Sequence, residues 1–108
     1  MTYQELLAAA VQVKEKYAQL NVKDGTDAWN GDKFMAGFVG DVGDLSKIIM
    51  AKGGYRRMDD VDAKLGHELA DCLWSVLVLA DHYGIDLEQE FVKTMGDLQR
   101  SIDAQLVA

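Results

Sequence analysis

The chain has 108 residues, of which 49% are hydrophobic and 27% are charged, and its formal net charge at pH 7 is −7. This length fits a single domain, residues 1–108, with one core. The acidic balance argues against electrostatic binding to nucleic acid or to an anionic membrane surface. It is compatible with a phosphorylated ligand if metal ions neutralise the protein's own acids.

The first predicted helix runs from about Thr2 to Leu20, and Thr2 with Glu5 has the pattern of a capping box at its start. Apolar residues recur along it at helical spacing, namely Leu6, Ala10, Val13, Tyr17 and Leu20. The stretch from Asn21 to Asp32 is dense in turn-forming residues and predicts a loop. The chain contains no proline, which favours long uninterrupted helices.

The second predicted helix runs from about Lys33 to Ala51 and ends at the pair Gly53 and Gly54. Its apolar positions are Phe34, Phe38, Val42, Leu45 and Ile49. A short connection over residues 54–60 follows, and Asp59 or Asp60 is expected to cap the next helix.

The third predicted helix, from about Val61 to Tyr83, is apolar around most of its circumference after Asp71, which predicts the central and most buried helix. Gly84 ends it. Asp86 with Gln89 then opens a fourth helix, which carries Leu87, Phe91, Met95, Leu98 and Ile102. Short connections between long helices imply antiparallel neighbours, so we predict an all-α four-helix bundle. The broad apolar surface of the third helix predicts oligomerisation.

The location expected from the sequence is the cytoplasm. Cys72 is the single cysteine and lies in an apolar helix, which excludes a disulfide framework and favours a reducing compartment. The first residues carry no basic segment ahead of their apolar positions, so no signal peptide is expected. The apolar run at residues 76–80 is too short to span a bilayer.

Two pairs of acids carry most of the functional information. Asp41 and Asp44, and then Glu68 and Asp71, are each spaced i, i+3, which places both carboxylates of a pair on one helix face. Both pairs interrupt apolar runs, where an uncompensated carboxylate is costly. Four carboxylates facing one cleft would favour a hard divalent metal, although two exposed helix edges remain an alternative.

The type of metal follows from the residues available. A di-iron bundle uses Glu-x-x-His steps, whereas His67 here directly precedes Glu68 and no histidine follows at i+3. One cysteine and two histidines make zinc a poor fit. Carboxylates alone suit Mg²⁺, with Mn²⁺ as a substitute, and Mg²⁺ typically joins carboxylates to substrate phosphates.

Other residues are secondary candidates. Trp29 precedes the second helix, where it either fastens the loop to the bundle or stacks on a base. His67 is either a partly buried polar residue or a ligand contact beside the acids. The cations that either contact phosphate or solvate the surface are Lys33, Lys47, Lys52, Arg56, Arg57 and Lys93.

The runs GFVGDVGDLSKII and HELADCLWSVLVLADHYGIDLEQEFVKTM resemble the all-α nucleotide pyrophosphohydrolases, the superfamily of MazG and the dCTP pyrophosphatases. The resemblance extends from about Trp29 to Met95. It implies that Asp41, Asp44, Glu68 and Asp71 bind Mg²⁺ and catalyse cleavage of a nucleoside triphosphate into a nucleoside monophosphate and pyrophosphate. It also implies a dimer or tetramer. Trp29 and Lys93 are the predicted substrate contacts.

The sequence departs from the family pattern at several positions. The family's first pair is Glu-x-x-Glu, but Asp41 and Asp44 are each one methylene shorter. Thr94 and Leu98 occupy positions where the family often has lysine and asparagine. These departures motivate an alternative function, a non-catalytic helical oligomer that binds a nucleotide or a protein. A third possibility is a purely structural helical dimer.

Overall fold

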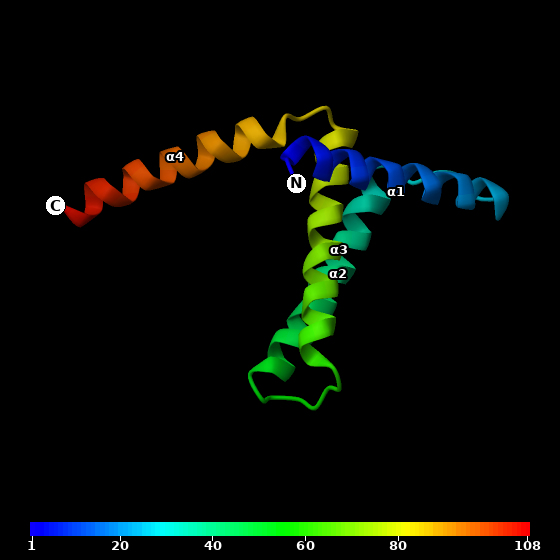
Figure 1. Ribbon diagram of the computed structural model, residues 1–108, viewed down its shortest axis with the longest axis horizontal. Coiled ribbons are helices and arrows are strands. Elements are labelled where there is room, and N and C mark those ends of the chain that lie inside the picture. Colours follow the sequence, from blue (N-terminus) through cyan, green and yellow to red (C-terminus); the bar gives the residue numbers. More distant parts are fainter.

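The computed structural model describes all residues from Met1 to Ala108 and contains four α-helices and no strand (Figure 1). The helices are α1 (Tyr3–Lys23), α2 (Gly31–Lys52), α3 (Val61–His82) and α4 (Leu87–Leu106). The all-α prediction is therefore confirmed, and each predicted helix matches an observed one to within about three residues. None of the four helices combines the length and apolar content needed to cross a lipid bilayer.

Local signals set most helix ends. The predicted capping box at α1 is present, because the Thr2 hydroxyl accepts from the Glu5 amide and the Glu5 carboxylate accepts from the Thr2 amide. The Asp86 carboxylate likewise accepts from the Gln89 amide at the start of α4, at 3.1 Å. The expected cap of α3 is wrong in one respect. Asp60 occupies the N-cap position in the left-handed conformation (φ 52°), and its side chain makes no capping hydrogen bond.

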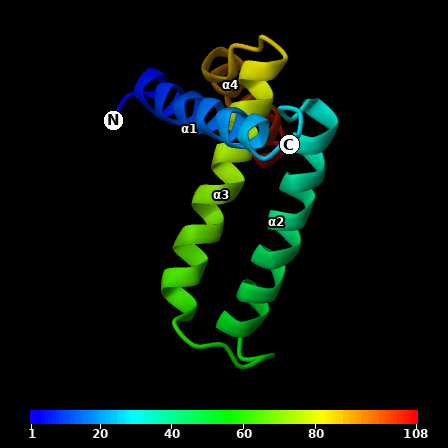
Figure 2. The ribbon, with the colours of Figure 1, turned by 90° about the vertical axis from the view of Figure 1, so that its right-hand side faces the viewer.

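The centre of the fold is an antiparallel hairpin of α2 and α3, joined by the loop at residues 53–60. Figures 1 and 2 show α1 crossing the upper end of this hairpin on one side, while α4 leaves on the opposite side. The helix α1 packs on α3, and the Trp74 indole N–H donates a hydrogen bond to the Ala10 carbonyl oxygen. Lys14 and Asp81 add an ion pair of 3.1 Å between the same two helices.

The core is small and lies where α1 crosses the hairpin. Its cluster of four buried side chains consists of Ala10, Phe34, Leu77 and Val78. The Phe34 ring makes edge-on contacts with the rings of Trp29 and Trp74, at centroid distances of 5.8 and 6.2 Å. The buried Phe34 ring and the partly buried Trp74 ring thus hold the start of α2 against the second half of α3.

The single chain does not close into a bundle. Its radius of gyration is 17.5 Å, whereas about 13 Å is expected for a compact domain of this length. The helix α4 packs along no other helix of the chain, because α2 with α3 and α1 with α3 are the extensive helix pairs. The predicted four-helix bundle and its oligomerisation therefore stay predictions.

The predicted apolar stripes are only partly covered. On α1 Ala10 is buried, but Leu6, Val13, Tyr17 and Leu20 are exposed. On α2 the predicted Phe34 is buried and so is Ile48, whereas the predicted Val42 and Ile49 are exposed. The prediction that α3 is the most buried helix is correct for its second half, which contains four of the chain's eight buried residues. It is wrong for Leu69 and Leu73, which are exposed.

Candidate metal centre

The four predicted metal ligands come from facing helices of the hairpin. Asp41 and Asp44 lie one turn apart in the middle of α2, and Glu68 and Asp71 lie one turn apart in the first half of α3. Because the helices are antiparallel and packed side by side, the middle of α2 lies opposite the first half of α3. The hairpin register therefore brings two pairs of acids from distant parts of the sequence together.

Glu68 belongs to two overlapping groups of possible ligands. Ligand atoms of Asp41, Asp44 and Glu68 lie within 4.8 Å of one another, and so do those of His67, Glu68 and Asp71. The two groups together contain all four predicted acids and add one histidine. The cluster is thus arranged around Glu68, with ligand atoms from both helices.

One oxygen in this cluster has no partner within the protein. Glu68 Oε2 is buried and makes no hydrogen bond. A buried carboxylate oxygen without a donor or cation is costly, so native structures rarely leave one unpaired. Because the neighbouring side chains are also carboxylates, a divalent cation is a suitable partner for this oxygen.

The pKa values record the same crowding of negative charge. Burial is the largest cause of the raised pKa of Glu68, and the charges of Asp71, Asp41 and Asp44 raise it further. The pKa of Asp41 is raised by burial first and then by Asp71 and Asp44. The imidazole of His67 opposes the rise in both cases. The acids of α2 and α3 therefore raise one another's pKa values across the hairpin. Two separate exposed helix edges would not produce this mutual effect.

His67 extends the cluster toward solvent. Its Nε2 lies 3.1 Å from a carboxylate oxygen of Asp71, and its side chain is 74% exposed. The interpretation of His67 as a partly buried polar residue is therefore wrong. Its position beside Glu68 and Asp71 places it at the rim of the acid cluster.

An open groove of about 570 Å³ adjoins the acids at the loop end of the hairpin. Its lining residues are Asp44, Lys47, Ile48, Met58, Asp60, Ala63, Lys64, His67 and Glu68. Lys47 and Lys64 thus lie in the same groove as two of the predicted metal ligands. Lys64 was not singled out from the sequence, although its position one turn before Glu68 could have indicated it.

The two predicted substrate contacts lie elsewhere. Trp29 packs its ring on Phe34 and over Gly37, where an added Cβ would approach the ring to 3.0 Å. This contact supports the role of fastening the loop to α2, while Trp29 stays 43% exposed.

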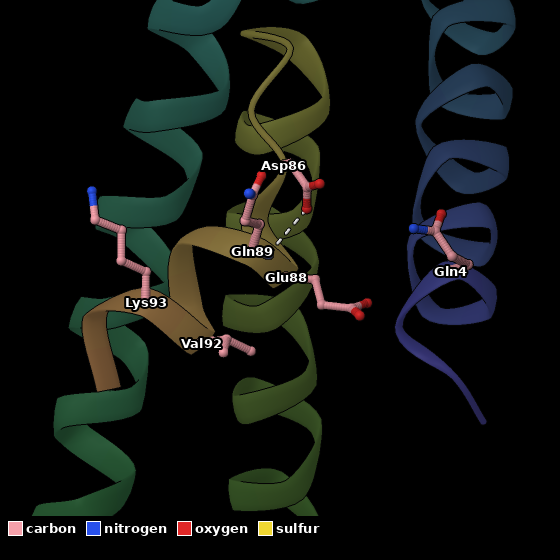
Figure 3. Close-up of a pocket in the computed structure, with 6 residues that line it drawn as sticks. All are labelled: Gln4, Asp86, Glu88, Gln89, Val92 and Lys93. Atoms are coloured by element: carbon pink, nitrogen blue, oxygen red, sulfur yellow. Dashed lines mark hydrogen bonds between the residues drawn. The ribbon is translucent and has the colours of Figure 1, made fainter. Parts of the chain in front are cut away.

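Lys93 lines a separate pocket of about 380 Å³, formed by the beginnings of α1 and α4 (Figure 3). The other residues around this pocket are Gln4, Asp86, Glu88, Gln89 and Val92, and none of the four predicted metal ligands is among them. Within one chain the structure therefore does not bring Lys93 to the acids.

Comparisons with protein-family models, with curated proteins and with solved structures found no match for this chain.

Proposed function

We propose that this protein is a Mg²⁺-dependent nucleoside triphosphate pyrophosphohydrolase that acts at the acid cluster of α2 and α3. The convergence of four carboxylates around the unpartnered Glu68 Oε2 is the observation that carries the proposal. The negative charge of these carboxylates would favour a bound cation. The adjoining groove contains two lysines, Lys47 and Lys64. The resemblance in sequence supports the same reaction.

Asp41, Asp44, Glu68 and Asp71 would hold Mg²⁺, with Mn²⁺ as a substitute. The bound cation would neutralise the carboxylates, bind phosphate oxygens and lower the pKa of a water molecule. Addition of that water across one phosphoanhydride bond, between the α and β phosphates, gives a nucleoside monophosphate and pyrophosphate.

The protein's own side chains would do the positioning. Lys47 and Lys64 would contact the phosphate chain in the groove, because ammonium groups are suited to phosphate oxygens. His67, through its contact with Asp71, would hold that carboxylate in place or accept a proton from the water.

Pyrophosphate release tests the proposal directly. Canonical and modified ribonucleoside and deoxyribonucleoside triphosphates would be supplied in turn, with Mg²⁺ and then with Mn²⁺. We expect release from a subset of these nucleotides, which EDTA abolishes. Glu68→Gln should also abolish it, whereas Glu90→Gln on the exposed surface of α4 should not.

The alternative function gives a different result in the same experiment. A non-catalytic relative would bind Mg²⁺ or nucleotide in calorimetry but release no pyrophosphate from any nucleotide of the panel. Absence of both metal binding and turnover would leave a purely structural helical protein.

A further inference from the structure

The groove beside the acid cluster extends from it toward the loop of the hairpin. Of the four acids it includes Asp44 and Glu68 but neither Asp41 nor Asp71. Because α2 runs toward the loop at residues 53–60 and α3 runs away from it, Asp44 and Glu68 are the acids nearer the loop. Asp41 and Asp71 lie toward the end of the hairpin that α1 crosses (Figure 2). The acid cluster therefore has two different ends.

The loop end of the cluster carries two unpaired cations. Lys47 of α2 comes three residues after Asp44, and Lys64 of α3 comes four residues before Glu68. Each lysine is thus about one helical turn from an acid, on the loop side. Neither ammonium group forms an ion pair within the protein. Two cations from different helices are therefore available to an anion in the groove.

The opposite end of the cluster has no comparable cations. No lysine or arginine lies between Asp71 and the end of α3 at His82. On α2 the nearest lysine before Asp41 is Lys33, more than two turns away. Residues 47–64, in contrast, contain five of the chain's 11 lysines and arginines against three acids, in a protein of net charge −7. The loop end of the hairpin is thus the end that attracts the more highly charged half of a ligand.

The other lining residues define the limits of this anion site. Ile48 is buried and Met58 is half buried, and apolar walls of this kind strengthen the attraction between an ammonium group and a phosphate. Asp60 lies one turn beyond Lys64 toward the loop, where its negative charge would set the outer limit of the site. The space for an anion therefore lies between the metal ligands and Asp60.

We propose that this groove is the subsite of the leaving pyrophosphate, in which Lys47 and Lys64 bind the β and γ phosphates while the nucleoside lies toward α1. The inference rests on the proposed function and adds the orientation of the substrate along the hairpin. The β and γ phosphates carry most of the negative charge of a triphosphate. They therefore occupy the end of the cluster where the unpaired lysines lie.

This orientation gives the lysines a role in the reaction. The oxygen of a water molecule forms a bond to the α phosphorus, a proton of that water is lost to solvent, and the bond from the α phosphorus to the bridging oxygen breaks. The electron pair of the broken bond stays on the bridging oxygen, which leaves as part of pyrophosphate. Negative charge thus develops on the half of the substrate beside Lys47 and Lys64, which stabilise it.

The subsite should select triphosphates over diphosphates. A nucleoside triphosphate places two phosphates beyond the cleaved bond, whereas a diphosphate of the same nucleoside places one. We expect kcat/KM for the triphosphate to exceed that for the diphosphate roughly a hundredfold or more. Lys47→Ala and Lys64→Ala should each reduce this ratio about tenfold. A ratio that is unchanged in both variants would overturn the subsite.

Binding of the two products tests the orientation without turnover. Calorimetry in the presence of Mg²⁺ would titrate the whole protein with inorganic pyrophosphate and, separately, with nucleoside monophosphates. We expect Lys47→Ala and Lys64→Ala each to weaken pyrophosphate binding about tenfold or more and to leave monophosphate binding unchanged. Lys16→Ala, at an exposed lysine of α1, is the matched control and should change neither. Loss of monophosphate binding with retained pyrophosphate binding would overturn the proposal, because it would place the nucleoside in the groove.

Failure of the subsite and failure of the hydrolase give different results. Turnover of triphosphates with pyrophosphate binding that is independent of both lysines would keep the hydrolase and overturn the subsite. Pyrophosphate binding that depends on both lysines, in a protein without turnover, would keep the anion site and remove the hydrolase. Both lysines are exposed, so their replacement removes charge and little packing, and circular dichroism of each variant verifies the fold.

Discussion

The indole N–H of Trp74 lies 3.1 Å from the carbonyl oxygen of Ala10 and donates a hydrogen bond to it. The bond crosses from α3 to α1 at the edge of the small core, and the Trp74 ring also contacts Tyr17 and Phe34 edge-on. One side chain therefore links the first helix to the hairpin that bears the acids.

Replacement of this side chain should loosen α1. Trp74→Phe removes the hydrogen bond and part of a partly buried ring, so we expect a loss of about 1–3 kcal/mol in the free energy of unfolding. Urea unfolding followed by circular dichroism measures it. Trp29→Phe is the matched control, because Trp29 makes no such hydrogen bond and is 43% exposed, and it should cost less. Equal losses in the two variants would contradict the role given to the hydrogen bond.

Glu68→Gln should stabilise the metal-free protein while removing its response to Mg²⁺. The substitution eliminates a half-buried charge that lies among three other acids. A gain of about 1 kcal/mol corresponds to roughly 4–8 °C in the thermal midpoint. We expect Mg²⁺ to raise the midpoint of the unmodified protein and not that of the variant. A lower midpoint for Glu68→Gln without metal would show that its carboxylate makes a stabilising contact.

The pH dependence of stability has a defined sign. The pKa values of Asp41 and Glu68 are raised in the folded protein, so the folded state holds their protons more tightly than the unfolded chain. Their stabilising contribution is complete below the unfolded values of about 4 and is lost as pH rises through the raised pKa values.

Comparison with Asp41→Asn/Glu68→Gln isolates these two groups from the other carboxylates. Without metal, we expect the double variant to gain in thermal midpoint over the unmodified protein as pH increases from 4 to 7. A difference that stays constant over this range would mean that the two carboxylates are not crowded.

The two lysines of the groove should act on substrate binding. Lys47→Ala and Lys64→Ala each remove one positive charge next to Asp44 and Glu68. If they contact the triphosphate, each should lower kcat/KM for pyrophosphate release by about tenfold or more, the equivalent of about 1.4 kcal/mol. Lys16→Ala on α1 serves as the control. Unchanged kinetics in both groove variants would place the phosphates elsewhere.

Much of the helical architecture could be predicted from local signals. The capping box at Thr2 and the cap at Asp86 act within four residues, so the sequence alone predicts where those helices begin. The i, i+3 spacing predicted that each acid pair shares a helix face. The charge of Asp71 raises the pKa of Asp41 because the hairpin register brings the two residues close together. Short-range sequence patterns do not predict that register.

The burial of individual apolar residues could not be predicted from the sequence. Periodicity identifies the apolar side of a helix but not the neighbouring element that covers it. Leu69 and Val78 lie on the same apolar helix, yet Leu69 is half exposed and Val78 is completely buried beneath α1 and α2. Lys93 was placed near the substrate from its sequence position. Its position in a pocket apart from the acids follows from the direction in which α4 leaves the hairpin (Figure 1).

The isolation of α4 also has a consequence for backbone hydrogen exchange. Beyond its first residues, where Leu87 packs against the core, α4 has no extensive contact with another helix. A helix of 20 residues with so little tertiary support is only marginally stable in water, so most of α4 in a lone chain would open and close rapidly. Its amides should then exchange with deuterium far faster than those of α3 near Val78. Protection would therefore fall along α4 from Leu87 toward Leu106, while the core end of α3 stays protected.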